Sequence, residues 1–209
     1  MPKADDMGRP RFLSNASPGL KAFTAVVVFG AAVWLLGFRL LWGDHGSEGR
    51  AANETPLAGD PVAVDRPAPD FTQPLISRLG SLSLARYQGK VIVVNFWAVY
   101  CAACRWEVPE LERLWRGYGG RGVQFLGVDY EDGPSAAMSF ARSHGMSYPS
   151  VLDPNGTVGD AYKILGLPTT YIIGPNNHIR YVVIGKINVA SFRVALESLL
   201  RTKASEVSG

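Results

Sequence analysis

Val-Ile-Val-Val-Asn-Phe-Trp-Ala-Val-Tyr-Cys-Ala-Ala-Cys-Arg-Trp-Glu-Val-Pro, residues 91–109, decides the fold, because it holds both cysteines of the chain, Cys101 and Cys104. Its first seven residues are β-branched and aromatic and predict a buried strand, while residues 104–115 carry apolar side chains at helical spacing. The cysteines therefore lie where a strand turns into a helix. The free N–H groups and positive dipole end of a helix favour a thiolate, so Cys101 is the expected nucleophile and Cys104 the shielded resolving thiol.

A Cys-x-x-Cys pair is typical of a redox dithiol, of half a zinc site or of a structural disulfide. A closed zinc site needs four ligands, but the chain has no second cysteine pair, and His45, His144 and His178 fall in separate segments. A disulfide across so short a gap closes a very small loop and stabilises a fold little. We therefore expect a redox-active Cys101–Cys104 disulfide with no metal and no other cofactor.

Glu107 lies three residues after Cys104 and so on the same face of the expected helix. A carboxylate there could accept the proton of the resolving thiol and return it. The alternative is a solvated surface charge, which is the usual state of a glutamate on a helix. Pro109 in the same helix predicts a kink, or an early end of the helix.

The net charge of +3 belongs to the N-terminal part of the chain. Residues 1–39 contain five basic and two acidic side chains, and the remaining residues are balanced. With 209 residues there is room for one domain of about 100–200 residues and additional segments. The balanced remainder gives no support for a nucleic-acid surface.

Residues 22–42 predict a transmembrane anchor. Ala22 to Phe38 is a run of 17 uncharged residues, extended by Leu40, Leu41 and Trp42 if Arg39 reaches the interface, and about 20 apolar residues cross a ~30 Å hydrocarbon core. Basic residues precede the run, so residues 1–21 are expected to be a cytoplasmic tail and the rest to lie outside the cell membrane. The alternative, a cleaved signal peptide, has a shorter apolar region of about 7–15 residues.

The remaining chain divides into an expected flexible linker at 43–66, a domain at 67–203 and a short tail at 204–209. The order of expected elements predicts an α/β fold whose first half is a βαβ unit and whose second half is antiparallel. Beyond the cysteine segment, strands are expected at 70–72, 81–84, 123–128, 151–152, 169–173 and 179–184, and helices at 134–144, 161–165 and 192–200.

The cysteine segment resembles the active site of the thioredoxin superfamily, specifically the membrane-anchored thiol–disulfide oxidoreductases of the TlpA/ResA/CcmG (DsbE) type. Pro67-Ala-Pro-Asp-Phe71 is similar to the start of that domain, and Gly166-Leu-Pro-Thr-Thr-Tyr171 to its cis-proline loop, so the resemblance spans about residues 67–201. It implies a thioredoxin-like fold, with a central mixed sheet flanked by helices and an N-terminal transmembrane helix.

The resemblance also implies roles for particular residues. Pro168 would be the cis-proline beside the disulfide, and Leu167 would offer backbone to an extended substrate segment, whereas Leu-Pro alone indicates only a turn. Glu107 falls on the acidic residue that the family uses near its resolving cysteine. Tyr100 and Trp97, the aromatic residues before the pair, are expected to contact substrate.

Asn95 distinguishes the chain from cytoplasmic thioredoxins, and two further positions depart from the family pattern. Asn95 stands where cytoplasmic thioredoxins have a buried aspartate, so the proton must be handled elsewhere, which favours Glu107. Tyr100 stands where tryptophan is usual, and Ala103 where proline is usual. No charged residue or histidine separates the cysteines, which favours a reductant over an oxidant.

The implied function is extracytoplasmic reduction of disulfides in exported proteins, with apocytochrome c as the leading substrate. Electrons would come from a membrane thiol carrier of the CcdA/DsbD type. Four alternatives stay open: a general disulfide oxidase or reductase, a copper-delivery protein, a peroxiredoxin and a pure binding module. Copper-delivery relatives space their cysteines by three residues, not two, and the peroxiredoxin signature requires Pro and Thr where the chain has Val94 and Ala98.

Overall fold

The computed structural model describes residues 58–77 and 79–207. The predicted basic tail, the anchor at 22–42 and most of the predicted linker lie outside these residues. Within the described part of the chain, no helix combines the length and the apolar character needed to cross a membrane.

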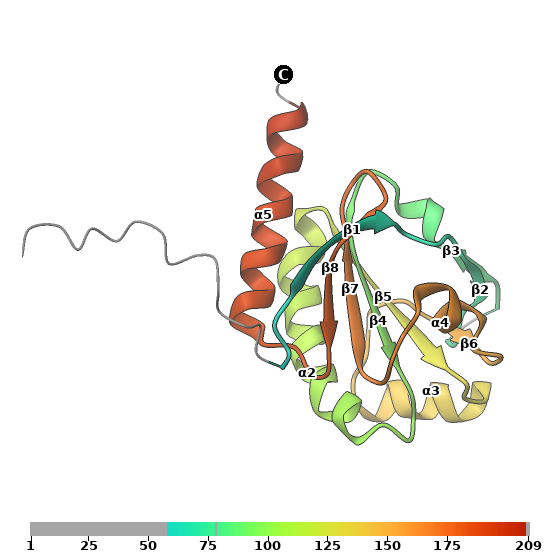
Figure 1. Ribbon diagram of the computed structural model, residues 1–209. Coiled ribbons are helices and arrows are strands. Elements are labelled where there is room, and N and C mark those ends of the chain that lie inside the picture. The colour runs from blue at the N-terminus through green and yellow to red at the C-terminus, as the bar shows by residue number, and fades with distance from the viewer. Residues whose placement is uncertain (1–57, 78, 208–209) are drawn as a thin grey trace, which may run out of the picture. The chain divides into compact units, whose positions relative to one another are not determined.

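A six-stranded mixed sheet with the order β1-β8-β7-β4-β5-β6 forms the centre of the described domain (Figure 1). Strands β4, β5 and β6 are parallel, and β7, β8 and β1 continue the sheet in antiparallel pairing. A second sheet pairs β2 with β3. The strands are β1 (Val62–Pro67), β2 (Thr72–Pro74), β3 (Ser81–Ser83), β4 (Val91–Trp97), β5 (Val123–Tyr130), β6 (Ser150–Asp153), β7 (Thr169–Ile173) and β8 (His178–Ile184).

Helices cover both faces of the sheet, so all seven residues of β4 are buried. Helices α2, α3 and α5 pack on the face that carries Val93 and Trp97, while α4 and the small sheet pack on the face that carries Val94 and Phe96. The helices are η1 (Leu84–Tyr87), α2 (Ala102–Tyr118), η2 (Gly119–Arg121), α3 (Pro134–Ser143), α4 (Thr157–Tyr162) and α5 (Val189–Val207).

Apart from β1, which was not predicted, the strands and α-helices follow the predicted order, including the parallel first half and the antiparallel hairpin of β7 and β8. The α2 helix runs through Pro109 instead of ending early. Pro109 and Arg105, the residue whose carbonyl loses its helical donor to the proline, are both exposed. Water can therefore satisfy that carbonyl.

Three predicted boundaries are wrong. The linker predicted to end at residue 66 overlaps β1, because Val62 to Pro67 pair with Val182 to His178 at the edge of the sheet. The tail predicted at 204–209 is helical as far as Val207. The helix predicted at 161–165 lies earlier, because the Asp153 carboxylate accepts the N–H groups of Val158 and Gly159 and starts α4 there.

Candidate active site

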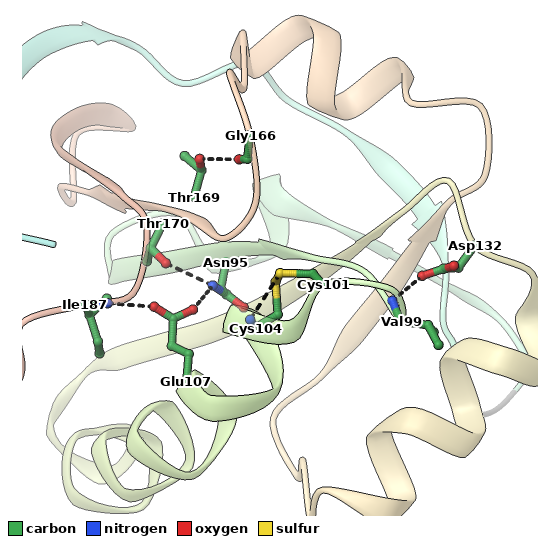
Figure 2. Close-up of a disulfide and its surroundings, with 10 residues drawn as sticks. All are labelled: Asn95, Val99, Cys101, Cys104, Glu107, Asp132, Gly166, Thr169, Thr170 and Ile187. Atoms are coloured by element: carbon green, nitrogen blue, oxygen red, sulfur yellow. Dashed lines mark hydrogen bonds between the residues drawn. A yellow bond between two sulfur atoms is a disulfide. The ribbon is translucent and has the colours of Figure 1, made fainter. Parts of the chain in front are cut away.

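Cys101 and Cys104 form a disulfide at the junction of β4 and α2, with an S–S distance of 2.03 Å (Figure 2). Cys101 is the N-cap of α2, and its Sγ accepts the backbone N–H of Cys104 at 3.1 Å. Cys101 keeps 8% of its surface exposed, whereas Cys104 keeps 1%. Cys101 is therefore the more accessible of the two to an incoming thiolate.

Glu107 is buried rather than solvated, with 1% of its surface exposed. Its Oε1 accepts the backbone N–H of Ile187 at 2.8 Å, and its Oε2 accepts the side-chain amide of Asn95 at 3.0 Å. The same Asn95 nitrogen donates to Thr170 Oγ1 at 2.9 Å. Two donors, one from β4 and one from the turn after β8, thus hold the carboxyl group one helical turn from Cys104, as Figure 2 shows.

Burial raises the pKa of Glu107 from 4.5 to about 7. The donors from Ile187 and Asn95, together with the charge of Lys186, oppose this rise only in part. A group with a pKa near neutrality can both give and take a proton at the pH of most cell compartments. Glu107 therefore has the burial, the position and the proton affinity that the resolving thiol needs from a partner.

The peptide bond between Leu167 and Pro168 is cis, as predicted. Because β7 runs antiparallel to β4, the segment before β7 lies at the end of the sheet that carries the disulfide. Thr169 Oγ1 donates to the carbonyl of Gly166 at 2.7 Å, and the N–H of Gly185 donates to the carbonyl of Pro168 at 2.8 Å. These bonds fix the loop from both of its sides.

A groove of about 450 Å³ opens over the disulfide. Its most exposed apolar side chains are Tyr100, at 66% exposure, and Leu165, at 86%. The predicted substrate contact of Trp97 is corrected, because Trp97 is completely buried and stacks on Phe140 with ring centroids 4.7 Å apart. The groove is lined by Tyr100, Cys101, Ala102, Ala103, Tyr130, Ile164, Leu165, Gly166 and Leu167.

On the other flank of the pair, an acidic side chain holds the loop that precedes Cys101. Asp132, in the loop after β5, accepts the backbone N–H of Val99 with its Oδ2 at 2.6 Å (Figure 2). Asp129, the penultimate residue of β5, is completely buried. Neither aspartate was singled out from the sequence, although an acidic residue closing the apolar run Phe-Leu-Gly-Val was a signal that could have been used.

Comparison with known proteins identifies the family of the chain and relatives with similar sequences. The model of the AhpC/TSA family matches residues 64–182, which is more than half of the chain. The thiol–disulfide oxidoreductase ResA of Geobacillus kaustophilus is 32% identical over 139 residues, covering 66% of this chain and 79% of that protein. The thiol:disulfide interchange protein DsbE of Pseudomonas aeruginosa is 31% identical over 171 residues, covering 81% and 87%.

Solved structures with a similar fold include other thiol–disulfide exchange proteins. A thiol:disulfide interchange protein of the thioredoxin family from Chlorobium tepidum has a TM-score of 0.59 and 25% identity, covering 66% of this chain and 99% of that one. A secreted thiol–disulfide isomerase from Corynebacterium glutamicum has a TM-score of 0.63 at 19% identity, covering 71% and 96%, and shows the fold alone. Fold and site define a thioredoxin-like thiol–disulfide oxidoreductase. The chain belongs to the AhpC/TSA family, with relatives of the ResA and DsbE type.

Proposed function

We propose that the protein is an extracytoplasmic reductant of disulfides in exported proteins and that apocytochrome c is its leading substrate. The observation that supports the exchange mechanism is the buried Glu107, with its pKa raised to about 7, one turn from the shielded Cys104. The resolving thiol is thereby provided with a base in a place that water does not reach.

Reduction would proceed in two exchanges. The Cys101 thiolate attacks one sulfur of the substrate disulfide, that S–S bond breaks, and a mixed disulfide forms while the other substrate sulfur leaves as a thiolate. Glu107 then takes the proton of Cys104, and the Cys104 thiolate attacks the Cys101 sulfur. The second substrate thiolate leaves, the Cys101–Cys104 disulfide forms, and two electrons have passed to the substrate.

The groove supplies the substrate contacts in this scheme. Leu167 lines the groove together with Cys101 and would pair its backbone with an extended segment of the substrate. Tyr100 and Leu165 would bury apolar side chains that flank the substrate cysteine. A substrate segment with a cysteine in extended or unfolded chain, such as an apoprotein before its cofactor is attached, fits such a groove.

The direction of electron flow depends on the compartment. The anchor expected at residues 22–42 would place the domain outside the cell membrane, where disulfides form spontaneously. A reductant there needs renewal, and a membrane thiol carrier of the CcdA/DsbD type would reduce the Cys101–Cys104 disulfide after each cycle. The absence of a charged residue between the cysteines favours this direction, because nothing there stabilises the thiolate further.

A Cys104→Ala variant in the membrane of the source cell tests the proposal, because it stalls the mixed disulfide on Cys101. We expect trapped adducts that contain a c-type apocytochrome or its maturation partner, and no adducts in the Cys101→Ala control. Capture of many unrelated exported proteins, together with a wild-type pool that is almost wholly oxidised, would instead show a general oxidase. Tight copper binding by the reduced wild-type protein without any trapped adduct would show a copper-delivery protein.

A further inference from the structure

Asp129 has an environment that the exchange mechanism does not explain. Its side chain is completely buried, and no donor among the described residues reaches either of its carboxyl oxygens. The neighbouring side chain that contributes most to the raised pKa of Asp129, after burial, is a second carboxyl, that of Asp132. Two carboxylates cannot bond each other, so a hydrogen bond between Asp129 and Asp132 requires a proton on one of them.

The proton belongs on Asp129. Asp132 is partly exposed and already has a donor in the Val99 N–H at 2.6 Å, whereas Asp129 is completely buried and has no donor among the described residues. Burial raises the pKa of Asp129 from 3.8 to about 8, and the carboxyl groups of Asp132 and Asp153 act in the same direction. At neutral pH Asp129 is therefore an acid that donates its proton to the Asp132 carboxylate.

Other charges around Asp129 do not replace this pairing. Asp153, at the end of β6, is fully engaged by the N–H groups of Val158 and Gly159 and by Thr157 Oγ1. Tyr100 feels the charge of Asp129 but has its own pKa raised, chiefly by burial, and so stays neutral. The α3 residues that face this layer, Ala137, Phe140 and Ala141, do not titrate.

Asp132 connects this pair to the redox centre. Val99, whose N–H it holds, lies two residues before Cys101, and the Cys101 N–H in turn donates to the Ala98 carbonyl at 3.1 Å. The loop from Ala98 to Cys101 thus depends on Asp132 for its anchor on the side away from Glu107 (Figure 2). Tyr100, in the middle of this loop, is a wall of the substrate groove.

We propose that Asp129 is a positioning residue of the redox centre: its proton bonds the Asp132 carboxylate, which holds Val99 and thereby fixes Tyr100 and the sulfur of Cys101. When Asp129 loses that proton, the two carboxylates repel and the anchor of the loop weakens. The inference deepens the proposed function, but it rests on exchange at Cys101 and not on the identity of the substrate. The inference predicts that the exchange rate falls in mildly alkaline solution because of Asp129 and not because of Glu107.

The test measures the rate of reduction of the Cys101–Cys104 disulfide by a small dithiol, in the full chain in detergent, from about pH 6 to about pH 10, with the rate divided by the thiolate fraction of the dithiol. The corrected rate of the wild type should fall by about tenfold above pH 8, as expected when a reacting atom is displaced. Asp129→Asn, a permanent N–H donor, should remove this fall, and Asp129→Leu should show the low rate already at neutral pH. Asp160→Asn, which removes an exposed charge on α4, is the matched control and should follow the wild type.

Equal pH profiles for the wild type and Asp129→Asn would overturn the inference, as would a normal neutral rate in Asp129→Leu. A second measurement needs no folded Asp129 variant. In Glu107→Gln, infrared difference spectra should show the carbonyl band of a buried protonated carboxyl group that disappears near pH 8 and is shifted by Asp132→Asn. If the band is missing, Asp129 and Asp132 share no proton and the inference is wrong. If the wild type shows no exchange at all, the proposed function is wrong, and the infrared result alone decides this inference.

Discussion

The carboxyl group of Glu107 is positioned by residues that lie far apart in the sequence. Asn95 comes from β4, and Ile187 follows β8, 80 residues after Glu107. Both contacts are donors, so the carboxylate is held in place without a salt bridge, and burial remains the dominant influence on its pKa. This combination leaves the group anchored and still able to change its protonation state.

Replacing Glu107 by Gln should slow exchange at neutral pH by about a hundredfold, because removing a general acid–base typically costs that much. The rate profile should also lose its dependence on an ionisation near pH 7, the value to which burial raises the Glu107 pKa. Stopped-flow measurement of dithiol oxidation against pH gives both quantities.

Glu110→Gln is the control for that measurement, since Glu110 lies three residues after Glu107 in α2 and forms an ion pair with the exposed Arg113. It should keep the wild-type rate and profile. If Glu107→Gln and Glu110→Gln behave alike, Glu107 has no part in proton transfer.

At the scale of elements, Gly127 in β5 lies close against the side chains of Trp97 and Ser150. A Cβ at this position would lie 2.8 Å from Trp97 Nε1 and 2.3 Å from Ser150 Oγ. The serine hydroxyl can rotate away, but the buried indole ring has no free space to enter. A side chain at position 127 must therefore push Trp97 toward α3.

We expect Gly127→Ala to lower the free energy of unfolding by about 1–3 kcal/mol, the usual cost of overpacking a core. Urea denaturation followed by tryptophan fluorescence measures it. Gly117→Ala is the contrasting variant, because nothing lies within 4 Å of its Cβ position in α2, and helix propensity should make it neutral or stabilising. A stable Gly127→Ala protein would show that Trp97 is less confined than its stacking on Phe140 indicates.

The elements with strong local patterns could be predicted from the sequence, and those that depend on distant partners could not. β4 and β7 match their predicted bounds because each is a run of β-branched and aromatic residues. β1 was missed because Val-Ala-Val-Asp-Arg-Pro lacks a buried face and is a strand only through its pairing with β8. The start of α4 was missed because Asp153, whose carboxylate accepts the first N–H groups of the helix, comes from the preceding strand.

The same distinction applies to the site. Cys101, Cys104 and Glu107 share one helix, so spacing alone related them to each other. The burial of Trp97 could not be predicted, because it depends on Phe140 of α3, which covers the indole ring. The bond from the Val99 N–H to Asp132 depends on a loop conformation that no periodic pattern encodes.

For the whole molecule, two buried acids make stability fall as the pH rises. The folded-state pKa of Glu107 is raised to about 7 and that of Asp129 to about 8, so the folded chain binds more protons than the unfolded chain above pH 4. Their stabilising contribution is complete below the unfolded pKa values and is lost as the pH rises through 7 and 8. Glu112 and Glu197, with lowered pKa values, act in the opposite direction and lose their contribution in acid.

The free energy of unfolding of the oxidised full chain should therefore be greatest near about pH 5 and should decline toward pH 9. Urea titrations at a series of pH values measure this curve. Glu107→Gln and Asp129→Asn should each flatten its alkaline side, and the double variant should flatten it most. A curve that rises between pH 5 and pH 8 would contradict the raised pKa values of both groups.

The turn between β8 and α5 touches both halves of the site. Gly185, in the left-handed region at φ +83°, donates to the Pro168 carbonyl, and two residues later Ile187 donates to Glu107. A peptide that bound to the proline loop would therefore act on the same short segment that holds the Glu107 carboxyl group. Substrate binding at the proline loop and proton transfer by Glu107 would then be energetically coupled through this turn. A substitution that destabilises the turn at Gly185 would be expected to weaken both.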